Sequence, residues 1–395
     1  MKTRKYLIIF LCVMLLILGN PIMATGTPTK DGTTSDGQPP KVRASAACLM
    51  EVATGRIYFA KQGDKRREPA SLTKIMTAIL AIEKGNLKDV VTVGKKAAAV
   101  SMGQDIGLSP GDRLYLEDLL KAALMYSAND STVAIGEHIA GSHDAFIKMM
   151  NDKAKVLGMK DTRYANTNGY HNPNHYTTAI DLAKLTCYAL KNPVFASFVR
   201  TREATITWLP KEKTGNPQEV QTETPRQRVI HNTNALLESN FEGINGVKTG
   251  TTPRAGKCLI ASATREGRQL VAVVLNSPNR WDDATNLLEY GFREFRPQVL
   301  SEKDEVMGEI PVVEGVEQKV TLVAAKKVEA YVARIDSDKV ERKINLAPPP
   351  KAPIKQGIKL GKATFVLHGQ EIATVDLVAN RNIKRLPWFK RIFKK

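Results

Sequence analysis

The chain has 395 residues, of which 43% are hydrophobic and 25% are charged. This composition is typical of globular proteins and excludes a largely disordered chain, and the length allows two domains with separate cores. Lys and Arg number 58 against 40 Asp and Glu, a net charge of +18. A surplus of this size points to an anionic partner: nucleic acid, an anionic membrane surface or an acidic polymer.

Residues 1–24 have the layout of a secretory signal peptide. Basic residues at Lys2, Arg4 and Lys5 precede an apolar stretch over 6–18, and Ala24 is a plausible last residue before cleavage. An uncleaved membrane anchor is the alternative, although the apolar stretch is short for one. In either case we expect an exported protein at the outer face of the cytoplasmic membrane or in the cell wall. That location disfavours nucleic acid and favours membrane or wall polymer.

Four cysteines are present, and Cys12 would leave with the signal peptide. The remaining three are Cys48, Cys187 and Cys258, so at least one cannot pair within the chain. We therefore predict small buried hydrophobic side chains rather than a disulfide framework.

The middle of the chain reads as one domain over residues 43–297. Residues 25–42 are rich in Thr, Gly and Pro and predict a flexible linker. A strand pair with a Thr54-Gly55 turn is expected over 43–61, helices dominate to about residue 200, and β-rich runs fill 243–277 before a last helix over 282–295. Strands at both ends with helices between them predict an α/β (α+β) fold with a mixed sheet covered by helices.

The C-terminal part changes character twice. Residues 298–379 are Val-rich and β-like, broken by a Pro-rich stretch at 347–353, and predict a small all-β domain. The tail, 380–395, has seven basic residues and no acidic one. Its apolar residues share one helical face, with Trp388 at the border: Leu386, Phe389, Ile392 and Phe393. This pattern predicts an amphipathic helix lying in an anionic membrane surface, the alternative being a solvated basic end.

The stretch 67–84, "EPASLTKIMTAILAIEKG", carries the first candidate for chemistry. Its apolar spacing predicts a core-packed helix, and Ser71 and Lys74 lie one turn apart at its start, so the amine can reach the hydroxyl. A serine needs a base to become a nucleophile, and a lysine can be that base if burial lowers its pKa. The alternative is an N-cap serine with a lysine that extends to solvent.

Two further motifs fit the same chemistry. Ser127 and Asn129, in "SAND", are expected in a loop between two helices, where a hydroxyl can relay a proton and an amide can hold a peptide carbonyl; either could instead be a helix N-cap. Lys248-Thr249-Gly250 falls on a predicted strand, where Lys and Thr can bind a carboxylate and Gly allows close approach of a ligand backbone. A second copy, Lys213-Thr214-Gly215, lies in a charged loop and is attributed to chance.

Ser-x-x-Lys, Ser-x-Asn and Lys-Thr-Gly in this order form the signature of active-serine penicillin-recognising enzymes. Together with "MNDKAKVLGMKDTRYANTNGYHNPNHYTTAIDLA" and "GVKTGTTPRAGKCL", they make the chain from about residue 43 resemble the serine-type D-alanyl-D-alanine carboxypeptidases, the low-molecular-mass penicillin-binding proteins. The resemblance implies a transpeptidase-like domain, a β-rich C-terminal domain and often an amphipathic tail. It implies removal of the terminal D-alanine from peptidoglycan stem peptides, covalent binding of β-lactams, and no cofactor.

The resemblance also implies a role for each matching residue. Ser71 would form the acyl-enzyme ester, Lys74 would accept its proton and Ser127 would shuttle it. The substrate-binding residues would be Asn129, Lys248, Thr249, Gly250 and Thr251. The backbone N–H groups of Ser71 and Thr251 would form the oxyanion hole.

The sequence departs from its relatives in two places. "NTNGY" at 166–170 lacks the Pro and Leu that relatives often have, which leaves the shape of that loop open. Thr251 stands where relatives vary, so substrate preference and deacylation rate stay open.

Three alternatives compete with these predictions. A class A-like β-lactamase shares the three motifs but uses a Glu-x-x-Leu-Asn segment for deacylation, and none occurs between Ser127 and Lys248. A non-catalytic wall-binding protein would not need an intact set of motifs. His171 and His175 have metal-ligand spacing, but Pro173 between them disfavours a helical metal face, and no metal site is predicted.

Overall fold

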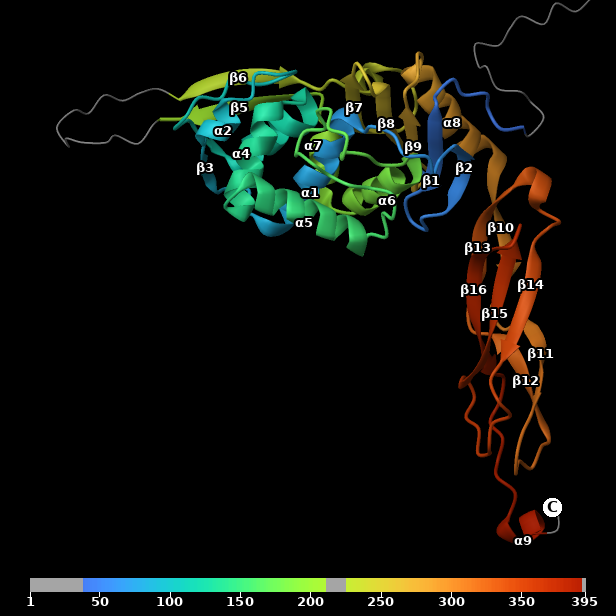
Figure 1. Ribbon diagram of the computed structural model, residues 1–395. Coiled ribbons are helices and arrows are strands. Elements are labelled where there is room, and N and C mark those ends of the chain that lie inside the picture. Colours follow the sequence, from blue (N-terminus) through green and yellow to red (C-terminus); the bar gives the residue numbers. More distant parts are fainter. Residues whose placement is uncertain (1–37, 211–224, 393–395) are drawn as a thin grey trace, which may run out of the picture. The chain divides into compact units, whose positions relative to one another are not determined.

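The computed structural model describes residues 38–210 and 225–392, without side chains for the last two (Figure 1). The predicted signal peptide, most of the predicted linker and the second Lys-Thr-Gly copy lie outside the described residues.

A five-stranded sheet forms the centre of the first part of the chain, in the order β2-β1-β9-β8-β7 (Figure 1). The strands span Ala46–Glu51 (β1), Ile57–Lys61 (β2), Ile244–Thr252 (β7), Gly256–Arg265 (β8) and Arg268–Leu275 (β9). All four pairings are antiparallel, not mixed as the sequence predicted. Three of the four follow from local connections: β1–β2, β7–β8 and β8–β9 are hairpins, and a short turn can join only antiparallel neighbours.

Both faces of this sheet are buried, so alternate residues of one strand enter different cores. On β1, Cys48 and Met50 pack in the core that contains α1, whereas Ala47 and Leu49 pack with Leu287 of α8. The wholly buried β1 therefore reads as a continuous apolar run instead of an alternating one. The three described cysteines are buried free thiols, as predicted.

Helices cover the face of the central sheet that packs against α1. A small sheet of order β3-β4-β5-β6 belongs to the same part of the chain. The helical segments are η1 (Ala70–Thr73), α1 (Lys74–Lys84), α2 (Lys95–Ala98), α3 (Leu116–Lys121), the π-helical η2 (Ala122–Tyr126), α4 (Asn129–Ala140), α5 (His143–Val156), α6 (Ala179–Leu190), α7 (Pro193–Arg200) and η3 (Ala235–Glu238). The small sheet contains Val90–Thr92 (β3), Arg113–Tyr115 (β4), Glu203–Leu209 (β5) and Arg226–His231 (β6). Helix α8 (Arg280–Glu294) packs on the other face of the central sheet.

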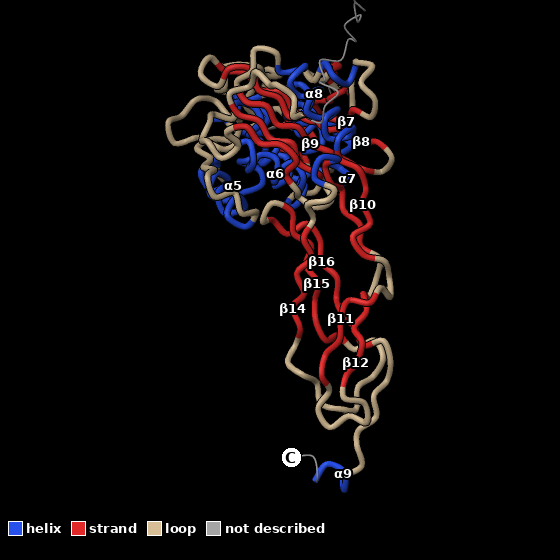
Figure 2. The backbone as a smooth tube through the Cα atoms, turned by 90° about the vertical axis from the view of Figure 1, so that its right-hand side faces the viewer, coloured by secondary structure: helices blue, strands red, loops and turns tan. Residues whose placement is uncertain are grey.

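Between α8 and residue 392, the last that the structure describes, the regular structure is all β, as predicted, apart from the turn η4 (Arg334–Asp336) and α9 (Trp388–Ile392) (Figure 2). A two-stranded pair, β10-β13, is followed by a five-stranded sheet of order β11-β12-β16-β15-β14. The strands are Phe295–Ser301 (β10), Val306–Pro311 (β11), Lys319–Ala324 (β12), Val328–Ala333 (β13), Glu341–Leu346 (β14), Lys359–Leu367 (β15) and Gln370–Ala379 (β16). None of the helices among the described residues is long and apolar enough to span a bilayer.

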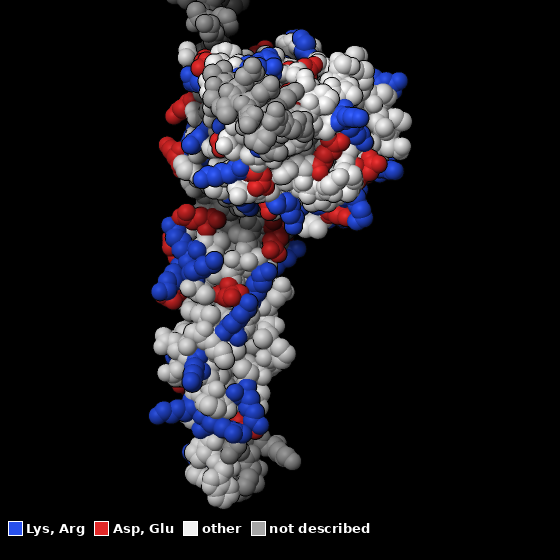
Figure 3. Space-filling model, turned by 90° about the vertical axis from the view of Figure 1, so that its left-hand side faces the viewer, with Lys and Arg blue, Asp and Glu red and all other residues white. Residues whose placement is uncertain are grey.

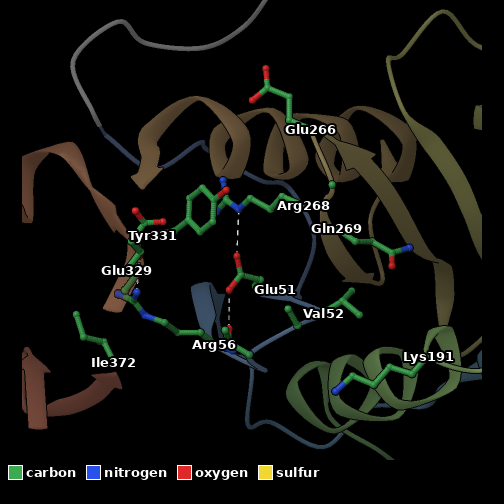
Figure 4. A pocket seen from close by; sticks show the side chains of 14 residues that line it. Glu51, Val52, Arg56, Lys191, Glu266, Arg268, Gln269, Glu329, Tyr331 and Ile372 are labelled. Atoms are coloured by element: carbon green, nitrogen blue, oxygen red, sulfur yellow. Dashed lines mark hydrogen bonds and ion pairs between the residues drawn. The ribbon is translucent and has the colours of Figure 1, made fainter. Parts of the chain in front are cut away.

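A buried ion pair lies where β1 and β9 meet the β10–β13 pair (Figure 4). Arg268 Nε donates to Glu51 at 3.1 Å, and both side chains are almost fully buried. The Arg268 guanidinium also lies 3.9 Å from the ring centroid of Tyr331 on β13 and donates to the Phe295 carbonyl oxygen at 3.2 Å. A cavity of about 510 Å³ opens beside this cluster and is lined by none of the predicted site residues.

Candidate active site

The predicted nucleophile lies on the tight turn η1, directly before α1. Ala70, the residue preceding Ser71, has φ 49°, in the left-handed region that a residue with a Cβ enters only at some cost. This conformation turns the chain sharply into the helix. Ser71 lines a cavity of about 380 Å³, while α1 is buried from Lys74 to Ala81.

Lys74 is fully buried beneath Ser71 and makes three polar contacts. Its Nζ lies 2.8 Å from Ser71 Oγ, 2.7 Å from Asn129 Oδ1 and 3.0 Å from the Asn168 carbonyl oxygen. The two amide oxygens can only accept hydrogen bonds. A neutral amine has two N–H bonds and one lone pair, so donation to both amide oxygens leaves the lone pair facing the Ser71 hydroxyl. The contacts therefore suit an uncharged lysine.

The electrostatic environment favours the same protonation state. Burial lowers the pKa of Lys74 well below its ordinary value, the positive charge of Lys248 lowers it further, and the carboxylate of Asp130 opposes the shift. The Asp130 carboxylate already accepts hydrogen bonds from the backbone N–H groups of Ile106 and Leu108, at 3.1 Å each.

Ser127 and Asn129 reach the cavity differently from the extended loop that the sequence predicted. The π-helical η2 ends at Tyr126. The next residue, Ser127, has a left-handed φ of 73°, and Asn129 is already the first residue of α4. A π-helical turn of this kind occurs often at functional sites. Asn129 is held at both ends of its amide: Oδ1 accepts from Lys74, and Nδ2 donates to the Met102 carbonyl oxygen at 2.7 Å.

Lys248, Thr249 and Gly250 lie on β7, as predicted. A Cβ added at Gly250 would lie 3.1 Å from the Ser71 backbone nitrogen, so a glycine lets β7 pack against the nucleophile turn. Burial, with a smaller contribution from Arg280, lowers the pKa of Lys248 to about 7. Thr249 Oγ1 shares a hydrogen bond of 2.6 Å with Thr233 Oγ1.

The structure thus brings together every predicted site residue. The cavity is lined by Ser71, Ser127, Asn129, Thr249, Gly250 and Thr251, with Lys74 beneath Ser71 and Lys248 buried on β7. The lining residues also include Asn168, Thr233 and Arg280, which sequence reasoning did not single out as site residues. The Nη1 atom of Arg280 donates to Thr251 Oγ1 at 3.0 Å and brings a second positive charge to the β7 side of the cavity. For Arg280 the sequence offered one signal: it is an arginine at the start of an amphipathic helix, shortly after the strand β9.

The two histidines considered as metal ligands have separate partners. His171 Nδ1 lies 2.9 Å from Glu68, whereas His175 is buried against Thr73. In the part of the chain that the structure describes, no group of His, Cys, Asp or Glu side chains could hold a metal ion.

A family model described as D-alanyl-D-alanine carboxypeptidase matches residues 33–279, and one described as the C-terminal domain of penicillin-binding protein 5 matches residues 295–385. The chain belongs to the D-alanyl-D-alanine carboxypeptidase family. The first match contains every predicted site residue. The second covers the all-β part and ends inside the predicted tail.

Individual relatives match over nearly the whole chain. The carboxypeptidase DacF of Bacillus subtilis is 30% identical, over 87% of this chain and 86% of its own. DacC of Escherichia coli is 31% identical, over 96% of this chain and 94% of its own. Among solved structures, penicillin-binding protein 5 of Haemophilus influenzae is 27% identical with a TM-score of 0.69, covering 88% of this chain and 99% of that one.

A fourth likeness is confined to the catalytic part. The Streptomyces K15 DD-transpeptidase is 31% identical with a TM-score of 0.59, covering 65% of this chain and 99% of that one. The protein is accordingly a penicillin-binding carboxypeptidase of the D-Ala-D-Ala type. Its family acts outside the cytoplasm on peptidoglycan and binds β-lactams.

Proposed function

We propose that this carboxypeptidase removes the terminal D-alanine of a stem pentapeptide through an ester on Ser71. Neutral Lys74 accepts the Ser71 hydroxyl proton as Oγ attacks the carbonyl carbon of the penultimate D-alanine. The backbone N–H groups of Ser71 and Thr251 bind the resulting oxyanion. The C–N bond then breaks, and Ser127 passes the proton to the departing amine. Water hydrolyses the ester and regenerates the hydroxyl.

The single observation that carries this proposal is the set of contacts at Lys74. Two fixed acceptors, Asn129 Oδ1 and the Asn168 carbonyl oxygen, leave one direction for the lone pair, and Ser71 Oγ lies in it at 2.8 Å. A buried amine whose pKa lies well below its ordinary value matches the requirement for a general base.

The substrate's ends fit the charge distribution of the cavity. The terminal carboxylate lies against Thr249 and Thr251, with Lys248 and Arg280 as the positive groups. Asn129 keeps one N–H free for a peptide carbonyl, since its other N–H donates to Met102. Without substrate the two cations repel one another, and the carboxylate relieves that repulsion.

Release of D-alanine from a synthetic stem pentapeptide tests the activity directly. We expect release by the wild type and none by Ser71→Ala, with benzylpenicillin attached to Ser71 alone in mass spectrometry of the digested protein. Ser337→Ala, next to the turn η4, is the matched control and should release D-alanine at the wild-type rate. A non-catalytic wall-binding protein would release none, and an adduct on another side chain would refute the assignment of Ser71.

The β-lactamase alternative differs in the lifetime of the adduct. Among the described residues that line the cavity, none is an aspartate or glutamate that could activate water as class A enzymes do. We therefore expect a long-lived penicilloyl ester. Repeated hydrolysis of the β-lactam within seconds would favour the alternative.

We also propose that the C-terminal end binds an anionic membrane surface. Trp388 and Phe389 on α9 are 69% and 49% exposed, and Val313 and Val316 are 47% and 55% exposed. These residues belong to one region, because the Val316 N–H donates to the Lys384 carbonyl oxygen at 2.9 Å and the Leu386 N–H donates to the Glu314 carbonyl oxygen at 2.8 Å. Figure 3 shows basic side chains spread along the β-rich part of one face, with few acidic ones in its lower half.

The truncation that tests this proposal must spare the β-rich part. Ile383 is buried in that part's core, so a deletion from residue 380 would damage the fold, whereas a deletion of 387–395 removes only Pro387, α9 and the last residues of the chain. We expect this truncated protein to lose most of its binding to phosphatidylglycerol vesicles, to keep its activity on soluble peptide, and to lose the remaining binding when Val316→Asp is added. Unchanged pelleting with the vesicles would refute the proposal.

A further inference from the structure

A buried histidine lies behind the nucleophile turn and contacts two segments that the proposed mechanism needs. The His175 side chain is 2% exposed. Its Nε2 lies 2.9 Å from Oγ1 of Thr73, the residue just before Lys74, and its Nδ1 lies 3.2 Å from the backbone nitrogen of Ala165. The ring also packs edge-on against Tyr164, with centroids 5.6 Å apart.

These two contacts fix the tautomer of the imidazole. The backbone N–H of Ala165 can only donate, so Nδ1 must be the unprotonated nitrogen. The ring proton is therefore on Nε2, which donates to Thr73 Oγ1. An imidazolium ion carries protons on both nitrogens and could not accept from Ala165. Burial lowers the pKa of His175 to about 4, which keeps the ring neutral at working pH.

Ala165 begins the turn that delivers the Asn168 carbonyl oxygen to Lys74. Asn166 Oδ1 closes this turn by accepting the Gly169 N–H at 2.7 Å. Gly169 has φ +88° and lies against η1, where a Cβ would come within 1.7 Å of the Ala70 carbonyl oxygen. The 165–170 turn and the nucleophile turn are thus in direct contact, and His175 bonds to both.

We propose that His175 is a positioning residue for acylation. Its Nε2-protonated ring links Thr73 to the 165–170 turn. This link, called the clamp below, keeps the Asn168 carbonyl oxygen in contact with Lys74 and the lysine lone pair directed at Ser71. The inference rests on the proposed role of Lys74 as base. His175 touches neither substrate nor the reacting atoms. It acts through the geometry of the base.

Kinetics of acylation by benzylpenicillin test the clamp. We expect His175→Ala and the nearly isosteric Thr73→Val each to lower the maximal acylation rate by about 10-fold to 100-fold, since a small misplacement of a catalytic group has effects of that size. The penicillin concentration at half-maximal rate should not change. Both substitutions remove the same hydrogen bond between His175 and Thr73, and His175→Ala also removes the one to Ala165. The double variant should therefore be no slower than His175→Ala alone. His171→Ala, in the same segment, is the matched control and should acylate normally.

Nitrogen NMR of the wild-type imidazole provides a readout that needs no variant. We expect an Nε2-protonated neutral ring at pH 7. A ring protonated on Nδ1, a Thr73→Val variant with the wild-type acylation rate, or rate losses that add in the double variant would each overturn the clamp. Failure of the proposed function would give different results. Penicillin would be attached to a side chain other than Ser71, or Lys74→Arg would be active, whichever tautomer His175 adopts.

Discussion

Nη1 of Arg280 lies 3.0 Å from Oγ1 of Thr251, and both residues line the same cavity as Ser71. The same nitrogen donates to the Gly250 carbonyl oxygen at 3.3 Å, so the guanidinium is held against β7. Lys248 brings a second positive charge from the same strand. In the proposed function, a carboxylate at the end of a substrate meets both charges.

Replacing Arg280 by Gln should therefore weaken binding of substrates with a free terminal carboxylate. A hydrogen bond to a charged group contributes about 1.5–3 kcal/mol, which corresponds to a KM raised by roughly 10-fold to 100-fold with a smaller change in kcat. Steady-state D-alanine release from a peptide and from its C-terminal amide measures the effect. The variant should lose much of the wild-type preference for the free acid. An undiminished preference would contradict the assignment.

Lys248→Met should stabilise the protein, and more so at pH 7 than at pH 10. The pKa of Lys248 is about 7 in the folded chain, below its ordinary value of about 10.4 when unfolded. Between those pH values the unfolded chain holds more protons, so the free energy of unfolding of the wild type rises with pH, and the lysine destabilises the fold most at and below pH 7. Burial near pH 7 thus costs on the order of a few kcal/mol.

Urea unfolding of the wild type and of Lys248→Met at the two pH values measures the difference. Equal stabilisation at pH 7 and pH 10 would mean that the lysine is not titrating between them. The exposed Lys326→Met is the control and should show no such pH dependence.

The parts of the site that the sequence predicted are those set by local spacing. Ser71 and Lys74 meet because residues three apart share a helical face. Lys248 lies on a strand because it falls in a β-rich run. Asn168, Thr233 and Arg280 lie outside the three short motifs, and only tertiary packing brings them to the cavity.

Local conformation was harder to predict than position. The left-handed backbone of Ser127 depends on the π-helical turn before it, which no periodicity in 122–126 signals. The smallness of Gly250 was attributed to ligand approach, yet its nearest neighbours are atoms of η1 and of the residue before it. The sheet directions also differ from the expected mixture, because short turns impose antiparallel pairing whatever the overall class of the fold.

Lys74→Arg should abolish acylation although the positive charge is kept. A guanidinium does not lose its proton at working pH, so it has no lone pair to accept the Ser71 proton. We expect no labelling by fluorescent penicillin over times at which the wild type is fully labelled. The melting temperature should be measured alongside, because a larger group at this fully buried position also crowds the core. Wild-type labelling would remove the lysine from the role of base.

The Glu51–Arg268 pair should matter for the fold and not for the chemistry. Arg268→Met leaves the buried Glu51 carboxylate without its cation and removes the guanidinium from the Tyr331 ring and from the Phe295 carbonyl oxygen. Loss of one partner of a buried pair costs about 3–5 kcal/mol, whereas replacing both partners costs much less. The free energy of unfolding should therefore fall more in Arg268→Met than in the Glu51→Gln/Arg268→Met double variant.

Arg265→Met is the matched control for this pair, since Arg265 lies on the same β8–β9 hairpin but pairs with the partly exposed Glu289. It should lose no more than about 1 kcal/mol. In Arg268→Met we also expect faster hydrogen exchange of the β13 amides, because the β10–β13 pair loses its contacts to the arginine, and unchanged acylation by penicillin. Equal destabilisation by the two single variants would show that the buried pair contributes no more than a surface one.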